Sequence, residues 1–414
     1  MNDPYRVFET LKDHYLMYIE SRFALRHSQL RQERRDLLDQ DEHLYREPHI
    51  EFVPPYQSSH KKLAEAALEI DGLPDELGDF AHHGLFESKN SLYKHQYEAI
   101  EAAQNKHVVI TAGTGSGKTE AFLIPVIARL LEESKRWPTN NLRPWAWWQG
   151  NGSRISQRGN EPRQRQAAIR TLILYPMNAL VEDQMQRLRK ALDSDEAHEW
   201  LKNHRGNNRF YFGRYTGQTP VSGSEINPVT NRPNTNKIDK LRSELQDMDR
   251  TMQSIKRDSE NAEKRNFFPC MDGGEMLTRW DMQSHPPDIL ITNYSMLNIM
   301  LLRDHEQGMI DQTRAWIESD PNNIFTLVID ELHMYRGTQG TEVAYLIRKL
   351  LHRLGLSDPK HAHQIRFIAA SASLEQNANG SRNGYQYLSE FFGVAANEDT
   401  FEIIGGTHEL PAQD

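Results

Sequence analysis

Residues 107–133 read HVVITAGTGSGKTEAFLIPVIARLLEE, and this stretch decides the fold class of the 414-residue chain. A short β-branched run leads into a glycine-rich turn, and a long apolar helix pattern follows it. Glycines let the backbone N–H groups of a turn curl around an anion, and the helix N-terminus adds the positive end of its dipole. The stretch therefore predicts a strand, a phosphate-binding loop and a helix.

The loop predicts the residues that bind a nucleotide. Lys118 is expected to reach the β- and γ-phosphates of ATP, and the Thr119 hydroxyl is expected to ligate Mg²⁺. Ala112 stands where the generic loop has its first glycine. The predicted nucleotide-binding residues of the loop are Ala112, Gly113, Thr114, Gly115, Ser116, Gly117, Lys118, Thr119 and Glu120.

Outward from this stretch, apolar strand patterns alternate with amphipathic helix patterns. Such alternation is typical of βαβ units and predicts a parallel α/β sheet flanked by helices. The clearest helix patterns cover 120–133 and 179–192. The predicted strands are 107–112, 171–176, 209–213, 288–293, 325–331 and 366–373.

A second chemical signal follows the apolar run FTLVI, where the chain continues Asp330-Glu331-Leu332-His333. A carboxylate at the tip of a buried strand beside the loop strand can hold the Mg²⁺ of a nucleotide, and Asp330 fits that role. Glu331 is placed to orient and deprotonate the attacking water, since phosphoryl transfer depends on positioning and charge neutralisation. By itself such a pair is usually a solvated strand end. Together with the loop it predicts Lys118, Asp330 and Glu331 as catalytic residues.

With these motifs in order, residues 90–405 resemble the superfamily 2 DExH-type helicases, whose loop is commonly AxTGxGKT. The resemblance implies a RecA-like first helicase lobe that uses ATP and Mg²⁺. It also implies that Gln96, in the stretch YKHQ, reads the adenine base. An ordinary glutamine on a helix surface is the alternative for Gln96.

The same resemblance extends to three nucleic-acid motifs and one coupling motif. YPMNAL (175–180), YTG (215–217) and TNY (292–294) look like the family's backbone-binding motifs, and SAS (371–373) looks like the motif that links ATP state to nucleic-acid grip. The implied coupling residues are His333, Ser371 and Ser373. The implied nucleic-acid contacts are Pro176, Asn178, Ala179, Thr216, Gly217, Thr292 and Asn293.

Longer stretches indicate a subfamily. PPDILITNYSMLNIMLLR, VIDELHMYRGTQGTEVAYLIRKLLHRLGL and IAASASLE resemble the large Lhr/YprA-like helicases, especially those of bacterial antiphage systems such as Druantia and DISARM. The resemblance implies an ATP-dependent helicase or translocase in antiphage defence, with DNA favoured over RNA and other defence proteins as partners. Two alternatives stay open: a translocase on double-stranded DNA that does not unwind it, and a nucleotide-dependent scaffold.

The chain holds one half of such a motor. After Ser373, 414 − 373 = 41 residues remain, whereas a second RecA-like lobe needs about 150 by ordinary domain size. The arginine element Q-x-x-G-R-x-x-R of that lobe is absent from the sequence. We therefore expect the N-terminal part of a longer helicase, and an isolated chain that hydrolyses ATP weakly because the arginines are missing.

We expect three segments: an N-terminal helical and extended arm at 1–88, the lobe at 89–405, and the start of a linker at 406–414. Two polar insertions interrupt the lobe, at about 137–166 and 218–285. The first holds four tryptophans among arginines, which favours a packed, Trp-anchored loop over a platform for stacking bases. The second holds apolar residues at steps of three and four, which favours a surface helix over a coiled coil.

Composition narrows the class of protein. The net charge is −9, so nucleic acid would have to meet a local basic face, and the single Cys270 excludes an internal disulfide or a thiolate-rich metal site. The N-terminus has no apolar signal segment, and no apolar run approaches the roughly 20 residues of a membrane span. A cytoplasmic protein without membrane partners is expected.

Overall fold

The computed structural model describes residues 3–40, 42–48, 54–86, 90–113, 115–141, 145–150, 152–159, 161–162, 164–227, 230–257, 265–372 and 381–409, with the backbone alone at 178–179 and 381–383. The chain divides into two compact units, one made by the residues up to Pro55 and the other by Tyr56–Glu409. Each unit is described by itself.

The N-terminal unit contains two helices, as the expected helical arm requires. Helix α1 spans Pro4–Arg22, where Asp3 caps its first turn by accepting from the Tyr5 amide, and α2 spans Ser28–Leu38. Arg35 of α2 contacts Glu20 of α1 at 3.1 Å. Most apolar side chains of α1 are exposed, so this unit buries little of its own apolar surface.

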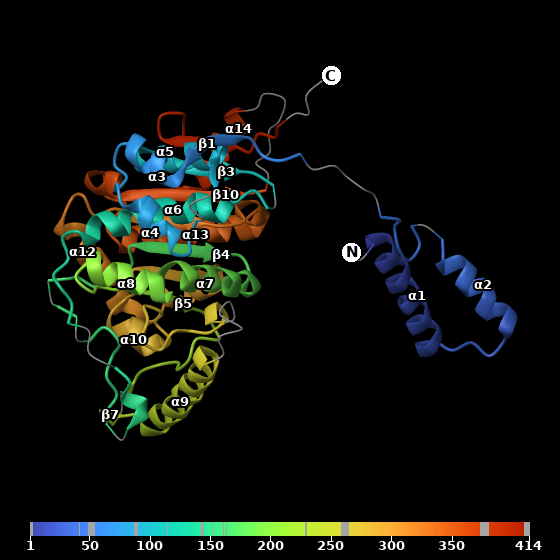
Figure 1. Cartoon of the computed structure of the whole chain (residues 1–414), viewed down its shortest axis with the longest axis horizontal. Helices are drawn as coiled ribbons and strands as arrows, with labels where there is room; N and C mark the ends of the chain where they lie inside the picture. Colours follow the sequence, from blue (N-terminus) through green and yellow to red (C-terminus); the bar gives the residue numbers. More distant parts are fainter. Residues whose placement is uncertain are drawn as a thin grey trace. The chain divides into compact units, whose positions relative to one another are not determined.

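The larger unit is built on a seven-stranded parallel sheet in the order β11-β3-β10-β9-β4-β8-β5 (Figure 1). This architecture confirms the predicted α/β class. The pattern had suggested a strand at 209–213, but β5 begins at Phe212 because that residue pairs with Ile289 of β8. The edge strand β11 was not predicted. The strands are β3 His107–Thr111, β4 Thr171–Tyr175, β5 Phe212–Tyr215, β8 Ile289–Asn293, β9 Phe325–Ile329, β10 Ile365–Ser371 and β11 Phe401–Gly405.

Helices cover both faces of the sheet and form a separate core with each. In β3, Val108 and Ile110 face one core while Val109 faces the other, because alternate strand residues point to opposite sides. The first face carries α3 Leu63–Glu69, α4 Leu77–His82, α5 Lys94–Asn105, α6 Lys118–Ser134, α7 Asn178–Leu192 and α8 Asp195–His204. The second carries α11 Tyr294–Met300, α12 Gln307–Ser319, α13 Gly337–Arg353 and α14 Ser381–Phe392. Before α3, β1 Ser58–Lys62 pairs antiparallel with β2 Ser91–Tyr93.

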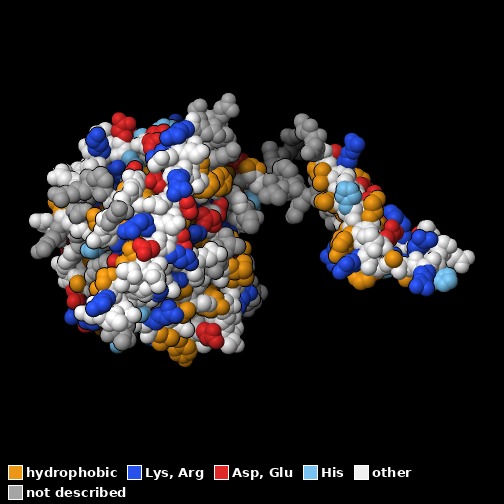
Figure 2. Space-filling model, turned by 90° about the horizontal axis from the view of Figure 1, so that it is seen from below, with side chains coloured by type: hydrophobic (Ala, Val, Ile, Leu, Met, Phe, Trp, Pro, Cys, Tyr) orange, Lys and Arg blue, Asp and Glu red, His pale blue; other side chains and the backbone are white. Residues whose placement is uncertain are grey.

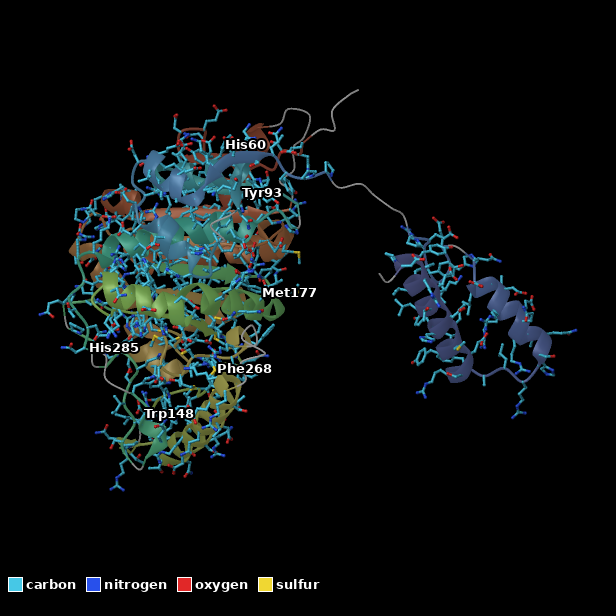
Figure 3. The ribbon with its side chains drawn as sticks, in the orientation of Figure 1. His60, Tyr93, Trp148, Met177, Phe268 and His285 are labelled. Carbon is cyan, nitrogen blue, oxygen red and sulfur yellow. The ribbon has the colours of Figure 1, made fainter. Side chains whose placement is uncertain are left out.

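The two insertions fold together beside β5, the last strand of the sheet, and lie below it in the view of Figures 1 and 3. Helix α9, Thr235–Arg257, packs Leu241 and Leu245 against Trp145, Trp147 and Trp148 of the first insertion. These indole rings are buried, so the packed-loop interpretation is confirmed, and the heptad-like stripe belongs to a helix lying on its own insertion partner. The same region includes η1 Trp147–Gln149, the β6 Ile226–Asn227 and β7 Arg232–Pro233 pair, and α10 Arg279–Ser284.

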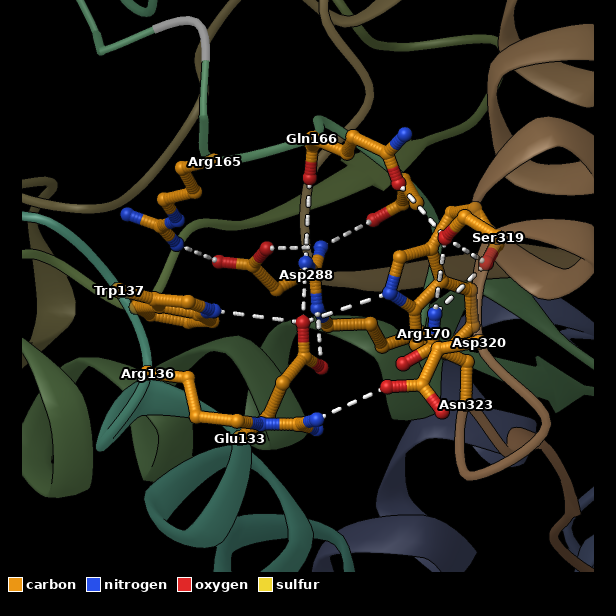
Figure 4. A network of polar contacts seen from close by, with 12 residues as sticks. Glu133, Arg136, Trp137, Arg165, Gln166, Arg170, Asp288, Ser319, Asp320 and Asn323 are labelled. Atoms are coloured by element: carbon orange, nitrogen blue, oxygen red, sulfur yellow. Dashed lines mark hydrogen bonds and ion pairs between the residues drawn. The ribbon is translucent and has the colours of Figure 1, made fainter.

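A buried ion network ties the first insertion to the amino ends of the strands (Figure 4). Asp288, which precedes β8, contacts Arg165 at 2.6 Å, Arg170 at 2.8 Å and Arg158 at 3.6 Å. Arg170 also pairs with Glu133 of α6 at 2.6 Å. Arginines that looked like candidates for binding nucleic acid are thus used to hold the insertion against the sheet.

Candidate nucleotide and nucleic-acid site

Parallel strands bring the phosphate loop, the DELH and SAS motifs and the three predicted nucleic-acid motifs to one edge of the sheet, because each lies at or just after the carboxyl end of a strand. Neighbouring strands β3, β10 and β9 end at the phosphate loop, at Ser371 and at Asp330. Neighbouring strands β4, β8 and β5 end at Pro176, Asn293 and the YTG motif. We call the first group of strand ends the nucleotide half of the edge and the second the nucleic-acid half, after the motifs predicted there; the two halves lie side by side.

The phosphate loop joins β3 to α6 as the sequence predicted. Gly115 and Gly117 have φ values of 74° and 73°, a left-handed conformation that costs little only at glycine. Lys118 begins α6, and its ammonium donates to the Ala112 carbonyl at 2.9 Å. Thr114 lies outside the described residues. The lysine closes the loop on itself in this conformation.

Three side chains from outside the loop hold its backbone. His95 Nε2 donates to the Ser116 carbonyl at 2.8 Å, and Gln96 Nε2 donates to the Gly117 carbonyl at 3.0 Å. The Tyr56 hydroxyl accepts from the Gly113 amide at 3.0 Å. Sequence reasoning missed Tyr56, which lies 57 residues before Gly113 in a segment without a motif, and His95, whose neighbour Gln96 was its only signal.

Gln96 is buried, and both ends of its amide are used within the protein. Its Oε1 accepts from the Tyr93 amide at 2.9 Å while its Nε2 holds the Gly117 carbonyl. The alternative of an ordinary surface glutamine is therefore wrong. Gln96 lines the nucleotide cleft, but it would have to exchange one of these bonds to contact a base.

A cleft of about 820 Å³ opens beside the loop. Backbone and side chains of Gly115–Glu120 form one wall, and Tyr93 and Gln96 belong to another. Among the described residues that line it, Lys118 and Arg187 are the two cationic ones. The volume and the loop amides suit a nucleotide, with its phosphates at the start of α6.

The carboxylates of the DELH motif stand at the tip of β9. Burial and the neighbouring Glu331 raise the pKa of Asp330 to about 6, although the Glu331 amide, Lys118 and Arg187 act in the opposite direction. The Glu331 amide donates to Asp330 Oδ1 at 2.9 Å, and Glu331 has a φ of 52°, a strained value for a residue with a side chain. A bound cation would stabilise the charged form of this carboxylate, which burial and Glu331 destabilise.

The residues expected to bind Mg²⁺ stand in the first turn of α6 and at the tip of β9. Gln184 of α7 is 6% exposed, and its Nε2 lies 3.5 Å from Thr119 Oγ1 while its Oε1 is buried without a hydrogen-bond partner. The hydroxyl of Thr119 and the carboxylate of Asp330 are the oxygen ligands that Mg²⁺ prefers. The described residues contain no cluster of three or more His, Cys, Asp or Glu side chains, so a cation here would rely on phosphate oxygens and water as well.

The nucleic-acid half presents backbone more than side chains. Thr216 and Thr292 are buried, and the Thr292 hydroxyl donates to the Tyr215 carbonyl at 2.7 Å. The Asn293 side chain caps α11 by accepting from the Met296 amide at 2.8 Å. Gly217 is exposed. The threonines and Asn293 thus shape the strand ends, while the side chains of Asn178 and Ala179 lie outside the described atoms.

Pro176 is half-buried, and the following Met177 is 53% exposed. Met177 and Tyr93, which lines the nucleotide cleft, lie on the same side of the larger unit (Figure 3). On the face seen in Figure 2, basic side chains are interspersed with acidic ones. That distribution matches the net charge of −9.

The coupling residues connect the DELH motif to β10. His333 Nδ1 lies 3.3 Å from Glu331 Oε2 and 3.3 Å from the Ala372 amide, from which it accepts. Ser371 is buried, and its carbonyl accepts from the Ala112 amide at 3.3 Å. Ser373 lies outside the described residues. His333 therefore lies between the Glu331 carboxylate and the end of β10.

Within the described part of the chain, no helix is long and apolar enough to cross a membrane.

The DEAD/DEAH box helicase family model matches residues 93–210. The chain is 32% identical over 442 aligned residues to Druantia protein DruE of Escherichia coli (strain UMEA 4076-1), an alignment that covers 97% of this chain and 22% of that protein. It is 22% identical over 328 residues to uncharacterized ATP-dependent helicase MJ1574 of Methanocaldococcus jannaschii, covering 76% of this chain and 32% of that protein. The chain thus spans less than a third of the length of either relative.

Solved structures similar to the chain include DUF1998 helicase MrfA bound to DNA, with 17% identity, a TM-score of 0.45, and coverage of 86% of this chain and 32% of that one. The same helicase bound to DNA and AMPPNP has 17% identity, a TM-score of 0.44, and coverage of 85% and 31%. The family match and the relationship to DruE confirm the resemblance seen in the motifs. Residues 93–210 of this chain therefore match the DEAD/DEAH box helicase family.

Proposed function

We propose that the chain is the ATP-binding lobe of an ATP-dependent helicase or translocase that acts on DNA in antiphage defence. One observation carries the proposal: the phosphate loop with its cleft and the three strand ends with nucleic-acid motifs form adjacent halves of one sheet edge. The similarity to Druantia protein DruE supports the defence role, and the choice of DNA over RNA rests on the subfamily resemblance of the motifs.

The proposed chemistry uses five side chains. Lys118 exchanges its bond to the Ala112 carbonyl for phosphate oxygens, and Thr119 and Asp330 hold Mg²⁺. Mg²⁺ would neutralise charge on the transferred phosphoryl group. Glu331 orients the attacking water and accepts its proton. Gln96 contacts the base after giving up one of its present hydrogen bonds.

The nucleic-acid backbone is proposed to cross the ends of β4, β8 and β5. Phosphates can be held by backbone N–H groups and helix N-termini, which read charge and not base identity. The exposed Gly217 and the start of α7 fit this mode, as the buried threonines leave mainly backbone for contact.

The chain alone is proposed to hydrolyse ATP weakly. Loss of the arginine that stabilises the transition state lowers phosphoryl transfer by about 10³–10⁵-fold, and the element that supplies it in this family is absent from the sequence. Residues of a longer protein or of a second chain would supply it.

Steady-state ATPase assays with and without single-stranded DNA test the proposal on the chain and on a version extended through a second lobe. DNA should stimulate the extended version, and Lys118→Ala should lower its rate by about 100-fold or more, as loss of a phosphate-stabilising group does. Lys349→Ala, which removes an exposed lysine of α13, is the matched control. Hydrolysis that is independent of both Lys118 and DNA would contradict the proposed function.

A further inference from the structure

Helices α6 and α7 divide the sheet edge between them. Helix α6 begins at the phosphate loop and packs on β10, whereas α7 begins at the YPMNAL motif and packs on β4, β8 and β5. Each helix therefore belongs to one half of the edge. Two polar contacts join the helices at the first turn of α6, at Thr119 and Glu120.

The first contact is between Gln184 and Thr119. Gln184 Nε2 lies 3.5 Å from Thr119 Oγ1, so its N–H points at a lone pair that a metal ligand needs. Once a lone pair of the hydroxyl oxygen binds a cation, the oxygen becomes a poorer acceptor and its O–H a stronger donor, and the buried Oε1 of Gln184 is an acceptor without a partner. Binding at Thr119 therefore favours a turn of the Gln184 amide.

The second contact is one turn further along the same face of α7. Arg187 pairs with Glu120 at 2.6 Å and with Asp183 of its own helix at 3.1 Å. Arg187 also lines the nucleotide cleft, and its charge acts on Asp330. An anion in the cleft competes with Glu120 for this guanidinium, which again changes how α7 is held.

Both contacts act on a helix whose start is a proposed site of phosphate binding. Gln184 and Arg187 lie about two and three turns after the N-terminus of α7, and a helix moves as a rigid element. A change at Thr119 or Glu120 is thus transmitted to the strand end of β4 without passing through the second lobe.

We propose that α7 couples the two halves of the sheet edge within this lobe, with Gln184 and Arg187 as positioning residues. The proposal rests on the proposed function, since it assumes that the start of α7 contacts nucleic acid. It predicts that nucleotide and nucleic acid change each other's affinity, and that these two side chains carry the effect.

The test measures binding of fluorescein-labelled (dT)20 to the 414-residue chain with and without Mg·AMPPNP, and binding of the nucleotide with and without (dT)20. Linkage requires the two affinity ratios to be equal, and we expect about a fivefold effect or more in the wild type. In Gln184→Ala and Arg187→Ala the ratio should fall toward 1, whatever the affinity of each ligand alone, because the ratio compares the same variant with and without the second ligand. Arg187→Lys, which keeps the charge, should restore part of the ratio.

Gln186→Ala is the matched control, because Gln186 lies on the same helix and forms no side-chain hydrogen bond within the described residues. If both ligands bind and Gln184→Ala and Arg187→Ala keep the wild-type ratio, the inference is wrong and the proposed function stands. A wild-type affinity ratio of 1 would likewise contradict the inference and leave the proposed function standing. If the wild type binds nucleotide but no (dT)20, the proposed function fails and the inference with it. If Gln184→Ala does not fold, the affinity ratio of Arg187→Ala tests the inference, because Arg187 is exposed.

Discussion

Two buried aspartates lie at opposite edges of the same sheet, and their surroundings shift their pKa values in opposite directions. Asp288, at the amino edge, is fully buried; burial alone would raise its pKa, yet Arg165, Arg158, Arg170 and a backbone hydrogen bond to Tyr211 hold that pKa below its ordinary value. Asp330, at the carboxyl edge, is 8% exposed, and its pKa rises to about 6 because burial and Glu331 outweigh its partners.

The two edges differ in how their charges are compensated, and this difference distinguishes groups that stabilise the fold from groups that serve a functional site. At the amino edge the charges are paired: Asp288 and Glu161 meet the arginines of the first insertion, and Glu133 meets Arg170. At the carboxyl edge, Lys118 donates to a carbonyl and has no carboxylate partner among the described residues, Asp330 has a carboxylate neighbour, and Glu331 has a strained backbone. Uncompensated groups of this kind are typical of a site that binds a charged ligand.

Replacing Asp288 with Asn should produce the largest effect. The change leaves three buried arginines without their shared carboxylate, and breaking a buried ion pair costs about 3–5 kcal/mol. Urea unfolding should show this loss in the free energy of unfolding. Asp239→Ala is the control, because Asp239 pairs with Arg242 on the exposed face of α9 and should cost less than about 1 kcal/mol. Equal effects of the two changes would contradict the comparison.

Replacing Asp330 with Asn should have the opposite sign and stabilise the fold by about 1–3 kcal/mol at pH 7. The amide removes a buried negative charge that the folded state disfavours, and its oxygen can still accept from the Glu331 amide. ATP hydrolysis should be lost together with the gain in stability. A destabilised Asp330→Asn protein would mean that the carboxylate is compensated in the free protein.

The pH dependence sharpens this point, because the folded state of the wild type binds the proton of Asp330 more tightly than the unfolded state does. Stability from this group is present below pH 3.8 and is lost as the pH rises from 3.8 through about 6. The difference in unfolding free energy between Asp330→Asn and wild type should therefore be small at pH 4 and reach its full value at pH 7. A difference that does not change over this range would rule out a raised pKa.

Tyr56→Phe should give the smallest effect. The ring still stacks on His408 at 4.2 Å, but the Gly113 amide loses its acceptor in the Tyr56 hydroxyl. One hydrogen bond is worth about 0.5–1.5 kcal/mol, so the dissociation constant of Mg·ADP should rise about 2–10-fold. Tyr97→Phe, which removes a hydroxyl 3.5 Å from Glu69, should leave that constant unchanged. A Tyr56→Phe protein with wild-type affinity would remove Tyr56 from the support of the loop.

The local pattern of the chain determined most of the fold and the identity of the site. Strand, glycine turn and helix at 107–133 specify the phosphate loop by neighbouring residues alone, and six of the seven sheet strands follow from apolar runs. Their carboxyl ends carry Asp330 and the nucleic-acid motifs, so a parallel sheet already implies one shared edge. These features depend on residues that are close in sequence, which is why they could be read without a structure.

Tertiary structure decided the features that join distant residues. It placed Tyr56 on Gly113, Gln184 on Thr119, and Trp148 against α9, and it paired Asp288 with arginines more than 100 residues earlier in the chain. The periodicity of the sequence does not predict such contacts, because they form between residues that only the packing of the whole fold brings together. The tryptophan- and arginine-rich insertion shows the consequence: its composition suits either base stacking or burial, and only the partners found in three dimensions decide for burial.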